Sequence, residues 1–354
     1  MVQARREVKW TRRMGLRRSH LKCLSIVWFV LNFFSGIAPI HSFAQQKSGV
    51  VPPVQADIGK ATRQRDKAGI RETADFDPAR VEAVRNEIQS ALDGLKIKMQ
   101  LVETEHLLVF TDLAPAESTS IAELAEKSFI SSCRFLKIGD TKSLFSTKLA
   151  VLVLEKDRFY DALQKVLFRT SFTASGSVLW RTDGESPCLL VSNLPAFAVR
   201  DPVFSNSWRD WTSRFVGTVV LLKRFPAYDA PSAVPVWLRD GFGLYASLVA
   251  KDDPELTQTY RSLIRERIQD KVRMFDFSSG QKDFYTFHVS SVVEYLLSVH
   301  GHQGFEAFIL VLQKQKVARD QRVSLDLQGE LGWDRETMER HWRHFAKTGQ
   351  RLAR

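Results

Sequence analysis

Histidine is absent from the whole middle of this 354-residue chain. The sequence holds eight histidines, and none lies between His106 and His288. An H-E-x-x-H zinc motif needs two histidines one helical turn apart, so this motif cannot occur anywhere in that stretch. Internal repeats and long low-complexity tracts are also missing, which leaves no sign of a repeat architecture.

Cysteine is scarce as well, with three residues in the chain. Cys23 belongs to an N-terminal leader, so only Cys133 and Cys188 remain for the folded part. One lies in an expected helix and the other in an expected strand, and both a disulfide and two buried free thiols stay open. No histidine motif accompanies either residue, which disfavours a catalytic cysteine.

One long apolar run, residues 23–40, follows a strongly basic segment. Residues 1–22 carry eight basic residues against a single acid. Together with the small residues Ser42 and Ala44, this pattern is typical of an export signal cleaved after Ala44. We therefore expect residues 1–44 to be a signal peptide and the mature protein to be periplasmic or secreted. The alternative is an uncleaved anchor in the inner membrane, facing the periplasm, because 18 apolar residues reach the short end of what spans a bilayer.

The leader also explains most of the positive charge. The formal net charge is +11, and the leader supplies +7 of it, which leaves +4 for the rest of the chain. Basic residues in the remainder are interspersed with acids, and no nucleic-acid-binding motif accompanies them. Nucleic acid is therefore not an expected partner, and a membrane is one only if the N-terminal segment stays uncleaved.

Composition predicts the domain organisation that follows the leader. Residues 45–76 contain Pro52-Pro53 and many polar residues, with no aromatic residue before Phe76, so we expect a flexible linker. We expect an N-terminal α+β subdomain over residues 77–205 and a helical subdomain over residues 206–350.

Local patterns predict a small sheet with helices in the first subdomain. Asp77-Pro78 is a favourable helix start, with the aspartate as N-cap and the proline at the first helical position. Short apolar, β-rich runs at 106–112 and 148–154 flank a helical stretch around 118–136. A turn sequence between 175–181 and 189–193 favours a β-hairpin.

Helical spacing dominates the second subdomain from Trp208 onward. Apolar residues recur there every three or four positions, and Gly301 is a natural helix C-cap. The expected fold class is therefore α+β: a small mixed sheet with helices, followed by a mostly helical domain. The expected helices are 207–224, 235–249, 255–268, 285–299, 304–313 and 335–345.

The string Val236–Tyr245 (VWLRDGFGLY) is similar to a known segment, P-x-W-L-x-E-G-x-A-x-Y. This segment belongs to the gluzincin metallopeptidases, in particular the bacterial peptidase MA-like and thermolysin-like groups. Tyr285–Leu297, Phe305–Leu312 and the tryptophan-bearing end of the chain also resemble that family's C-terminal region. The resemblance covers about residues 100–346, and its most specific part surrounds Trp237. It implies a thermolysin-like metallopeptidase domain.

The resemblance also shows where zinc ligands would be expected. In that family, both histidines of H-E-x-x-H and the glutamate of W-L-x-E-G hold the metal, and a bound water becomes the nucleophile. The family spacing places Gly217, Thr218 and Leu221 at the histidine, glutamate and histidine positions, and Asp240 at the third ligand. These four residues are therefore expected to be vestigial metal-site positions. We expect no catalytic residue, no metal ligand, no zinc and no other cofactor.

Arg214, Tyr285 and His288 are possible residues of the former cleft. An Asp240 without a metal should protonate or find a partner. Arg214 lies three residues before Gly217 on the same helical face, which predicts an Arg214–Asp240 ion pair. His288 is an alternative partner, and an Asp240 that faces solvent at its helix start is a further possibility. Tyr285 lies on the same expected helix as His288.

Two classes of function remain open. The leading one is a catalytically inactive pseudopeptidase that binds an unknown peptide or protein ligand, by strand addition to the edge of the small sheet, or has a structural role. The rival is a hydrolase or peptidase that uses unrecognised groups, such as a metal bound by Asp240, His288 and other residues brought together in space.

Overall fold

The computed structural model describes residues 76–155, 159–168, 178–182, 186–192, 207–226, 234–268, 272–277, 282–314 and 326–350. The chain divides into two units between Ala68 and Gly69, and every described residue belongs to the second unit. The expected signal peptide, residues 1–44, and the expected linker as far as residue 75 lie outside the described residues. Within the described ranges, no helix is both long enough and apolar enough to span a bilayer.

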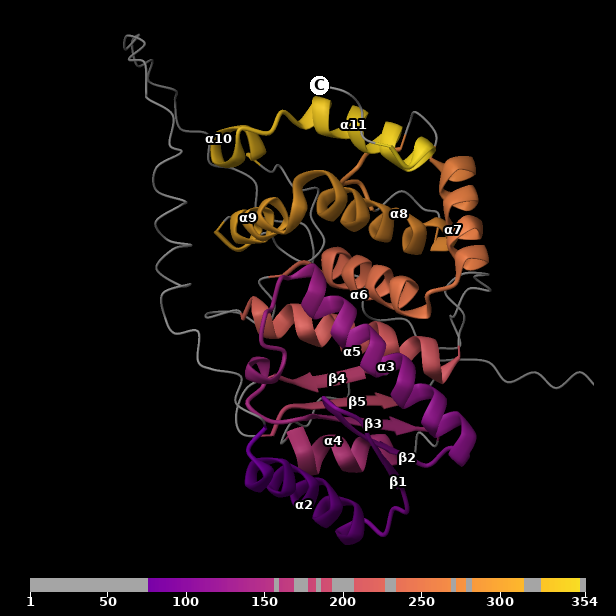
Figure 1. The fold of residues 1–354 in the computed structure, drawn as a ribbon, viewed down its shortest axis with the longest axis vertical. Helices are drawn as coiled ribbons and strands as arrows, with labels where there is room; N and C mark the ends of the chain where they lie inside the picture. The colour runs from indigo at the N-terminus through magenta and orange to yellow at the C-terminus, as the bar shows by residue number, and fades with distance from the viewer. Residues whose placement is uncertain are drawn as a thin grey trace, which may run out of the picture. The chain divides into compact units, whose positions relative to one another are not determined.

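A five-stranded mixed sheet forms the first part of the described chain (Figure 1). The strands are β1 (Gln100–Glu103), β2 (Leu107–Thr111), β3 (Leu149–Leu154), β4 (Val178–Arg181) and β5 (Cys188–Ser192), in the order β1-β2-β3-β5-β4. The three central strands are parallel, and each outer strand is antiparallel to its neighbour. The predicted mixed sheet and the predicted hairpin are confirmed.

Burial explains which strands the sequence reveals. Every residue of β2, β3 and β5 is buried, because helices cover both faces of the sheet, and these strands are the continuous apolar runs. β1 alternates between half-buried and exposed residues, and β4 is half-buried throughout. The short β1 (QLVE) carries no apolar run, which is why the pattern did not predict it.

Two helices, α2 (Pro78–Gly94) and α4 (Tyr160–Phe168), cover one face of the sheet (Figure 1). Asp77 caps α2 as predicted, by accepting a hydrogen bond from the backbone N–H of Ala79. Apolar residues of both helices share a core with side chains from that face of the sheet, including Leu108 and Phe110. This core is separate from the larger one on the other face.

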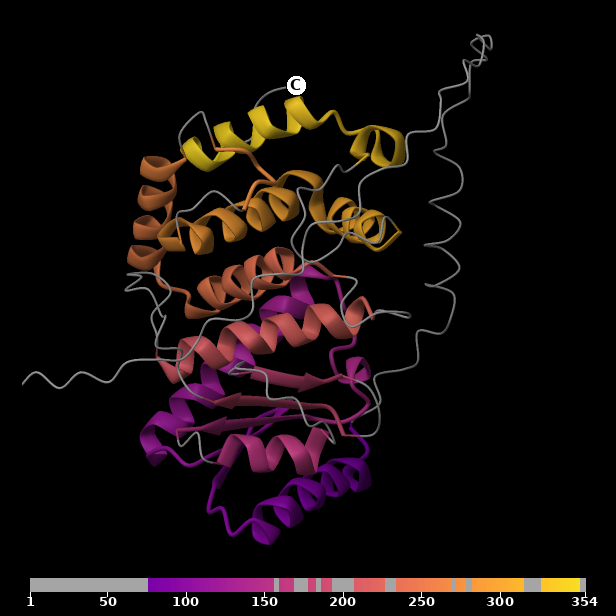
Figure 2. The same ribbon diagram turned by 180° about the vertical axis from the view of Figure 1, so that it is seen from behind.

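The other face carries α3 (Pro115–Phe135) and α5 (Trp208–Arg224), and α6 (Val236–Lys251) packs against both of them (Figures 1 and 2). The expected helices at 207–224 and 235–249 are therefore confirmed, and they form a packed pair. Trp208 and Trp237 are buried, and Trp211 is half-buried.

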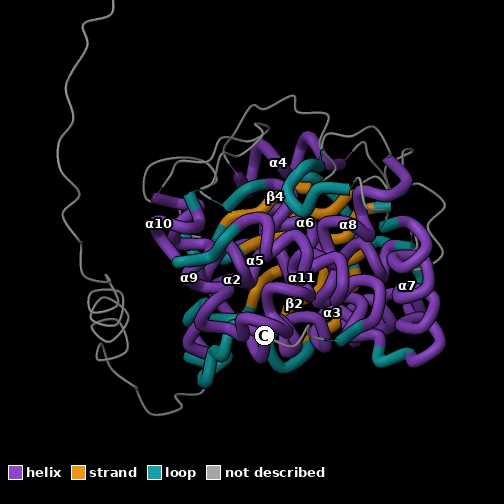
Figure 3. Tube along the Cα trace, turned by 90° about the horizontal axis from the view of Figure 1, so that it is seen from above, coloured by secondary structure: helices purple, strands orange, loops and turns teal. Residues whose placement is uncertain are grey.

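Further helices are stacked beyond α6, away from the sheet (Figures 1 and 2), and in the view from above the helices overlap the strands (Figure 3). A π-helical turn, Leu296–His300, connects α8 to α9, and Gly301 ends it with a positive φ of 68° that favours glycine. The mostly helical second part is therefore confirmed. Its remaining elements are α7 (Pro254–Arg267), α8 (Lys282–Tyr295), α9 (Gly301–Lys314), α10 (Leu327–Leu331) and α11 (Arg335–Thr348).

Two glycines allow α6 to lie close to a helix on each side. A Cβ at Gly241 would lie 2.4 Å from the carbonyl oxygen of Val289 on α8, and a Cβ at Gly243 would lie 2.4 Å from the carbonyl oxygen of Arg214 on α5. Both contacts are with backbone, so no side-chain rotation can relieve them. The glycines of the family-like string therefore fix the spacing of α5, α6 and α8.

Candidate functional site

The antiparallel pair α5–α6 brings three of the four expected vestigial positions, Gly217, Thr218 and Asp240, to one interface. The hydroxyl of Ser213 hydrogen-bonds to that of Ser247 at 3.0 Å, and Thr218 donates to the carbonyl of Arg239 at 3.2 Å. These contacts join the start of α5 to the end of α6 and the middle of α5 to the start of α6. The two helices therefore lie side by side.

The residues at this interface do not fit a zinc ion. A Cβ at Gly217 would lie 3.1 Å from Oγ of Ser132 and 3.2 Å from Cβ of Ala246, so α3 and α6 already fill the space that a histidine would need. Thr218 hydrogen-bonds to backbone carbonyls, and Leu221 is fully buried. None of the three side chains offers the imidazole or carboxylate that this position requires.

Asp240 is held by an arginine and a tyrosine. Its Oδ1 lies 3.1 Å from Nη2 of Arg214, and its Oδ2 accepts a hydrogen bond of 3.0 Å from the hydroxyl of Tyr285. The Arg214 and Asp240 side chains keep 15% and 21% of their exposure, so water only partly screens the pair. The predicted Arg214–Asp240 ion pair is confirmed, and the alternative of an unpaired, solvent-facing Asp240 is wrong.

In the cluster of Arg214, Asp240 and Tyr285, neighbouring rings contact the arginine, and burial keeps the tyrosine protonated. The guanidinium carbon of Arg214 lies 4.8 Å from the ring centroid of Trp211 and 5.4 Å from that of Phe215. Burial, and then the negative charge of Asp240, raises the pKa of Tyr285 well above its ordinary value. The tyrosine therefore keeps its proton and remains a hydrogen-bond donor.

His288 lies in the core, so its assignment as a cleft residue or a partner of Asp240 is wrong. Its side chain is 3% exposed, and its Nε2 lies 3.1 Å from the carbonyl oxygen of Met274. Its ring stacks on Phe284 and Trp342, with centroids 5.6 and 5.2 Å away. Burial lowers the pKa of His288 to about 4, so the imidazole is neutral. The prediction failed because the packing of α11 and residues 272–277 over α8 is not encoded in the spacing along α8.

Arg239 is a further neighbour of this cluster that the sequence did not single out. The residue is 8% exposed, and its guanidinium carbon lies 5.4 Å from the ring centroid of Trp180 on β4. The contact connects the first turn of α6 to an outer strand of the sheet. Trp180 lies in the hairpin that the sequence predicts. Its contact with Arg239 depends on the order of the strands in the sheet, which the sequence does not show.

The two cysteines of the folded part are free thiols. Both are buried, and they belong to the separate cores on the two faces of the sheet. Of the two possibilities left open, the structure therefore shows unpaired thiols. Burial raises the pKa of both Cys133 and Cys188 to about 12, which makes a catalytic thiolate unfavourable.

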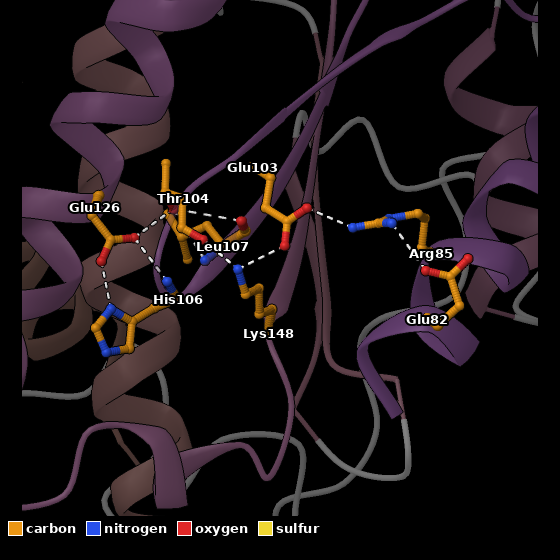
Figure 4. A network of polar contacts seen from close by, with 8 residues as sticks. All are labelled: Glu82, Arg85, Glu103, Thr104, His106, Leu107, Glu126 and Lys148. Atoms are coloured by element: carbon orange, nitrogen blue, oxygen red, sulfur yellow. Dashed lines mark hydrogen bonds and ion pairs between the residues drawn. The ribbon is translucent and has the colours of Figure 1, made fainter. Parts of the chain in front are cut away.

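A second polar group surrounds His106 at the start of β2 (Figure 4). Ligating atoms of Glu105, His106 and Glu126 lie within 4.8 Å of one another. Protein groups already engage the ring, because Nδ1 lies 2.5 Å from Glu126 and Nε2 lies 2.7 Å from Oγ1 of Thr141. Sequence reasoning missed this group, since its members are up to 35 residues apart. That the protein binds no zinc or other cofactor stays a prediction.

A third buried polar group centres on Glu294 of α8. Its carboxylate forms an ion pair with Arg261 of α7 and a hydrogen bond with Tyr260. Burial raises the pKa of Glu294 from 4.5 to about 7, although Arg261 opposes this shift. Protonation of this residue is therefore coupled to folding in the neutral pH range.

The stability of the protein is expected to fall between pH 5 and pH 7 because of Glu294. Glu294 loses its proton near pH 4.5 in the unfolded chain and near pH 7 in the folded protein. The contribution of protonated Glu294 to the free energy of unfolding is therefore full below pH 4.5 and is lost as the pH rises through 7. Glu294→Gln should remove roughly 1–2 kcal/mol of this pH dependence. Urea unfolding at both pH values measures it, with Glu266→Gln on the exposed side of α7 as the control. An equal stability difference between wild type and Glu294→Gln at both pH values would contradict the assignment.

Comparison with known proteins adds no relative. No family model matches the chain, and no curated protein matches it. The function is therefore inferred from the geometry of the α5–α6 interface and from the resemblance carried by residues 236–245.

Proposed function

We propose that the protein is an exported pseudopeptidase, with a thermolysin-like, gluzincin-type domain whose zinc site has been replaced by the cluster of Arg214, Asp240 and Tyr285. The observation that carries this proposal is the guanidinium of Arg214, 3.1 Å from the carboxylate at the third-ligand position. A side-chain cation thus neutralises Asp240 where the resembled family uses a metal ion. Because no group at Gly217, Thr218 or Leu221 supports water activation, the proposed activity is binding and not proteolysis.

The basic and apolar leader supports a periplasmic or secreted location for this binding protein. If residues 1–44 are retained, the same domain is anchored in the inner membrane and faces the periplasm. The linker of residues 45–76 then connects the domain to its anchor, and the binding site is unchanged.

The outer strand β4 supports a peptide as the ligand. β4 is last in the sheet order, and among the described residues it pairs only with β5. Such a strand accepts an extended peptide through its outward backbone groups. The guanidinium of Arg239, on α6, lies against Trp180 of β4. A cation beside the outer strand favours a peptide with acidic side chains.

Fluorescence anisotropy tests this ligand class directly. The probe is a fluorescein-labelled peptide of alternating valine and glutamate with blocked ends, compared with its glutamine counterpart. We expect the glutamate peptide to bind about tenfold more tightly, which corresponds to about 1.4 kcal/mol, and Arg239→Gln to remove this preference. Arg265→Gln, on the exposed side of α7, is the matched control and should change nothing.

Three results would count against the proposal. If neither peptide binds at millimolar concentration, or if Arg239→Gln leaves the affinities unchanged, peptide binding at β4 is refuted. Stoichiometric zinc in the purified protein would refute the replacement of the metal site, because the residues at the α5–α6 interface leave no place for it.

The rival function, a hydrolase with unrecognised groups, finds no support at Asp240 and His288, because His288 contacts Met274 in the core. One observation favours a hydrolase elsewhere in the molecule: the hydrogen-bonded chain through His106. Its geometry is independent of the α5–α6 interface.

A further inference from the structure

The side chains of Glu126, His106 and Thr141 form a continuous hydrogen-bonded chain. Oε1 of Glu126, on α3, lies 2.5 Å from Nδ1 of His106, and Nε2 of the same ring lies 2.7 Å from Oγ1 of Thr141. A carboxylate, an imidazole and a hydroxyl thus follow one another through opposite nitrogens of one ring. This order is the one that activates a hydroxyl as a nucleophile.

The carboxylate determines which groups carry the protons. Burial opposes ionisation of Glu126, but hydrogen bonds from His106 and Thr104 outweigh it and lower the pKa of Glu126 below its ordinary value. An ionised carboxylate can only accept, so Nδ1 of His106 is the donor. In the neutral ring, Nε2 then accepts, and the Thr141 hydroxyl donates its proton to it. Nε2 is therefore oriented as a general base toward Thr141.

Surrounding contacts hold the imidazole in this orientation. Oε2 of Glu126 accepts hydrogen bonds from the hydroxyl of Thr104 at 2.6 Å and from the backbone N–H of His106 at 3.2 Å, as Figure 4 shows. The ring of Phe129 stacks on the imidazole with centroids 4.7 Å apart. His106 is 3% exposed, so neither the ring nor the carboxylate is free to rotate.

Thr141 differs from its two partners because it is only half-buried. It lies directly before the 3-10 helix Lys142–Leu144, in a turn where Oδ1 of Asp140 accepts a hydrogen bond of 3.1 Å from the backbone N–H of Lys142. The side-chain ammonium of Lys142 lies 3.9 Å from Oε1 of the exposed Glu105. The chain of contacts therefore leads from a mostly buried carboxylate to the hydroxyl of a half-buried residue.

We propose that Thr141, His106 and Glu126 form a second functional site, a nucleophile–base–carboxylate triad that hydrolyses carboxylic esters. Oγ1 of Thr141 forms a bond to the ester carbonyl carbon, and its proton passes to Nε2 of His106. The bond to the alcohol breaks, and the alcohol leaves with that proton. Water then attacks the acyl-threonine, His106 takes the proton of the water and returns it to Oγ1, and the carboxylic acid is released.

A fluorophosphonate probe tests the nucleophile without knowledge of the natural ester. Oγ1 of Thr141 displaces fluoride from phosphorus, and the adduct stays on the residue. We expect mass spectrometry of the labelled wild-type protein to place the adduct on Thr141. Thr141→Val should abolish labelling at this position, whereas Thr141→Ser should retain it. Thr141→Val is at a half-buried position and keeps the shape of threonine, so it is expected to fold.

His106 and Glu126 are tested by the rate of the same labelling. His106→Gln and Glu126→Gln should each slow the reaction by at least about 100-fold, the usual contribution of a positioned base. Circular dichroism of each variant shows whether it is folded, and Glu123→Gln, on the exposed side of α3, is the control. Hydrolysis of 4-nitrophenyl acetate should fall in parallel with labelling.

Three results would overturn the proposal. The first is a wild-type and a Thr141→Ser protein that both remain unlabelled at residue 141. The second is hydrolysis of 4-nitrophenyl acetate that persists in Thr141→Val. The third is a folded Glu126→Gln variant that labels as fast as wild type, because a purely structural carboxylate would change stability and not the labelling rate.

Discussion

Replacing Gly241 by alanine is expected to destabilise the fold by about 3 kcal/mol or more. The new methyl group would lie 2.4 Å from the carbonyl oxygen of Val289 and 2.8 Å from its carbonyl carbon. Overpacking of a core costs about 1–3 kcal/mol when side chains can adjust, and more when a backbone has to move. In this case α6 and α8 must separate, and the contacts of α6 with α5 are strained with them.

Urea unfolding measures this effect, and a matched glycine is available in the same chain. Gly94 ends α2 and has nothing within 4 Å of its Cβ position, so Gly94→Ala should change the stability little. Gly243→Ala should be about as damaging as Gly241→Ala, since its Cβ would also lie 2.4 Å from a backbone oxygen. If Gly241→Ala and Gly94→Ala had the same stability, the close packing of α6 and α8 would be refuted.

Replacing Asp240 by asparagine is expected to destabilise the protein by about 2–3 kcal/mol. The change removes the charge that Arg214 faces at 3.1 Å and leaves a mostly shielded guanidinium without an anion. Breaking a buried pair costs about 3–5 kcal/mol, and we reduce this value because the two side chains keep some contact with water. The hydroxyl of Tyr285 still finds an oxygen in asparagine, so the loss comes mainly from the ion pair.

A double-mutant cycle with Arg214→Met isolates the pair. The double mutant should recover part of the stability that Asp240→Asn loses, because the unpaired guanidinium is gone. Glu82→Gln serves as the control, since Glu82 belongs to a more exposed pair with Arg85 and should cost under about 0.5 kcal/mol. A loss no larger for Asp240→Asn than for Glu82→Gln would show that the Arg214–Asp240 contact does not contribute to stability.

Local chemistry allowed much of the fold to be predicted from the sequence. Asp77 and Pro78 specify the start of α2, and the apolar runs of β2 and β3 are long enough to be recognised. The nine-residue α4 and the five-residue α10 were missed because they are too short to show a helical period. The order of the strands could not be predicted, because it depends on contacts between residues far apart in the sequence.

In the candidate sites too, contacts that depend on local spacing were predictable from the sequence, and contacts between distant residues were not. The Arg214–Asp240 pair was predictable, because a buried carboxylate needs a partner and helical spacing places Arg214 on the correct face. The role of Tyr285 was suggested only by its helix, and that suggestion failed for His288 three residues later. Glu126 and Thr141 lie 20 and 35 residues from His106, so no local pattern connects them. Contacts between residues on different helices and strands can be identified only from the tertiary structure.

The Arg214–Asp240 pair changes what the protein needs from its surroundings. A metal centre depends on the supply of the ion, and chelating agents can remove it. A guanidinium is part of the polypeptide, is made with every copy of the chain, and stays charged in any environment where proteins fold. The junction of α5 and α6 is therefore complete as soon as the chain has folded, and zinc starvation would leave it intact.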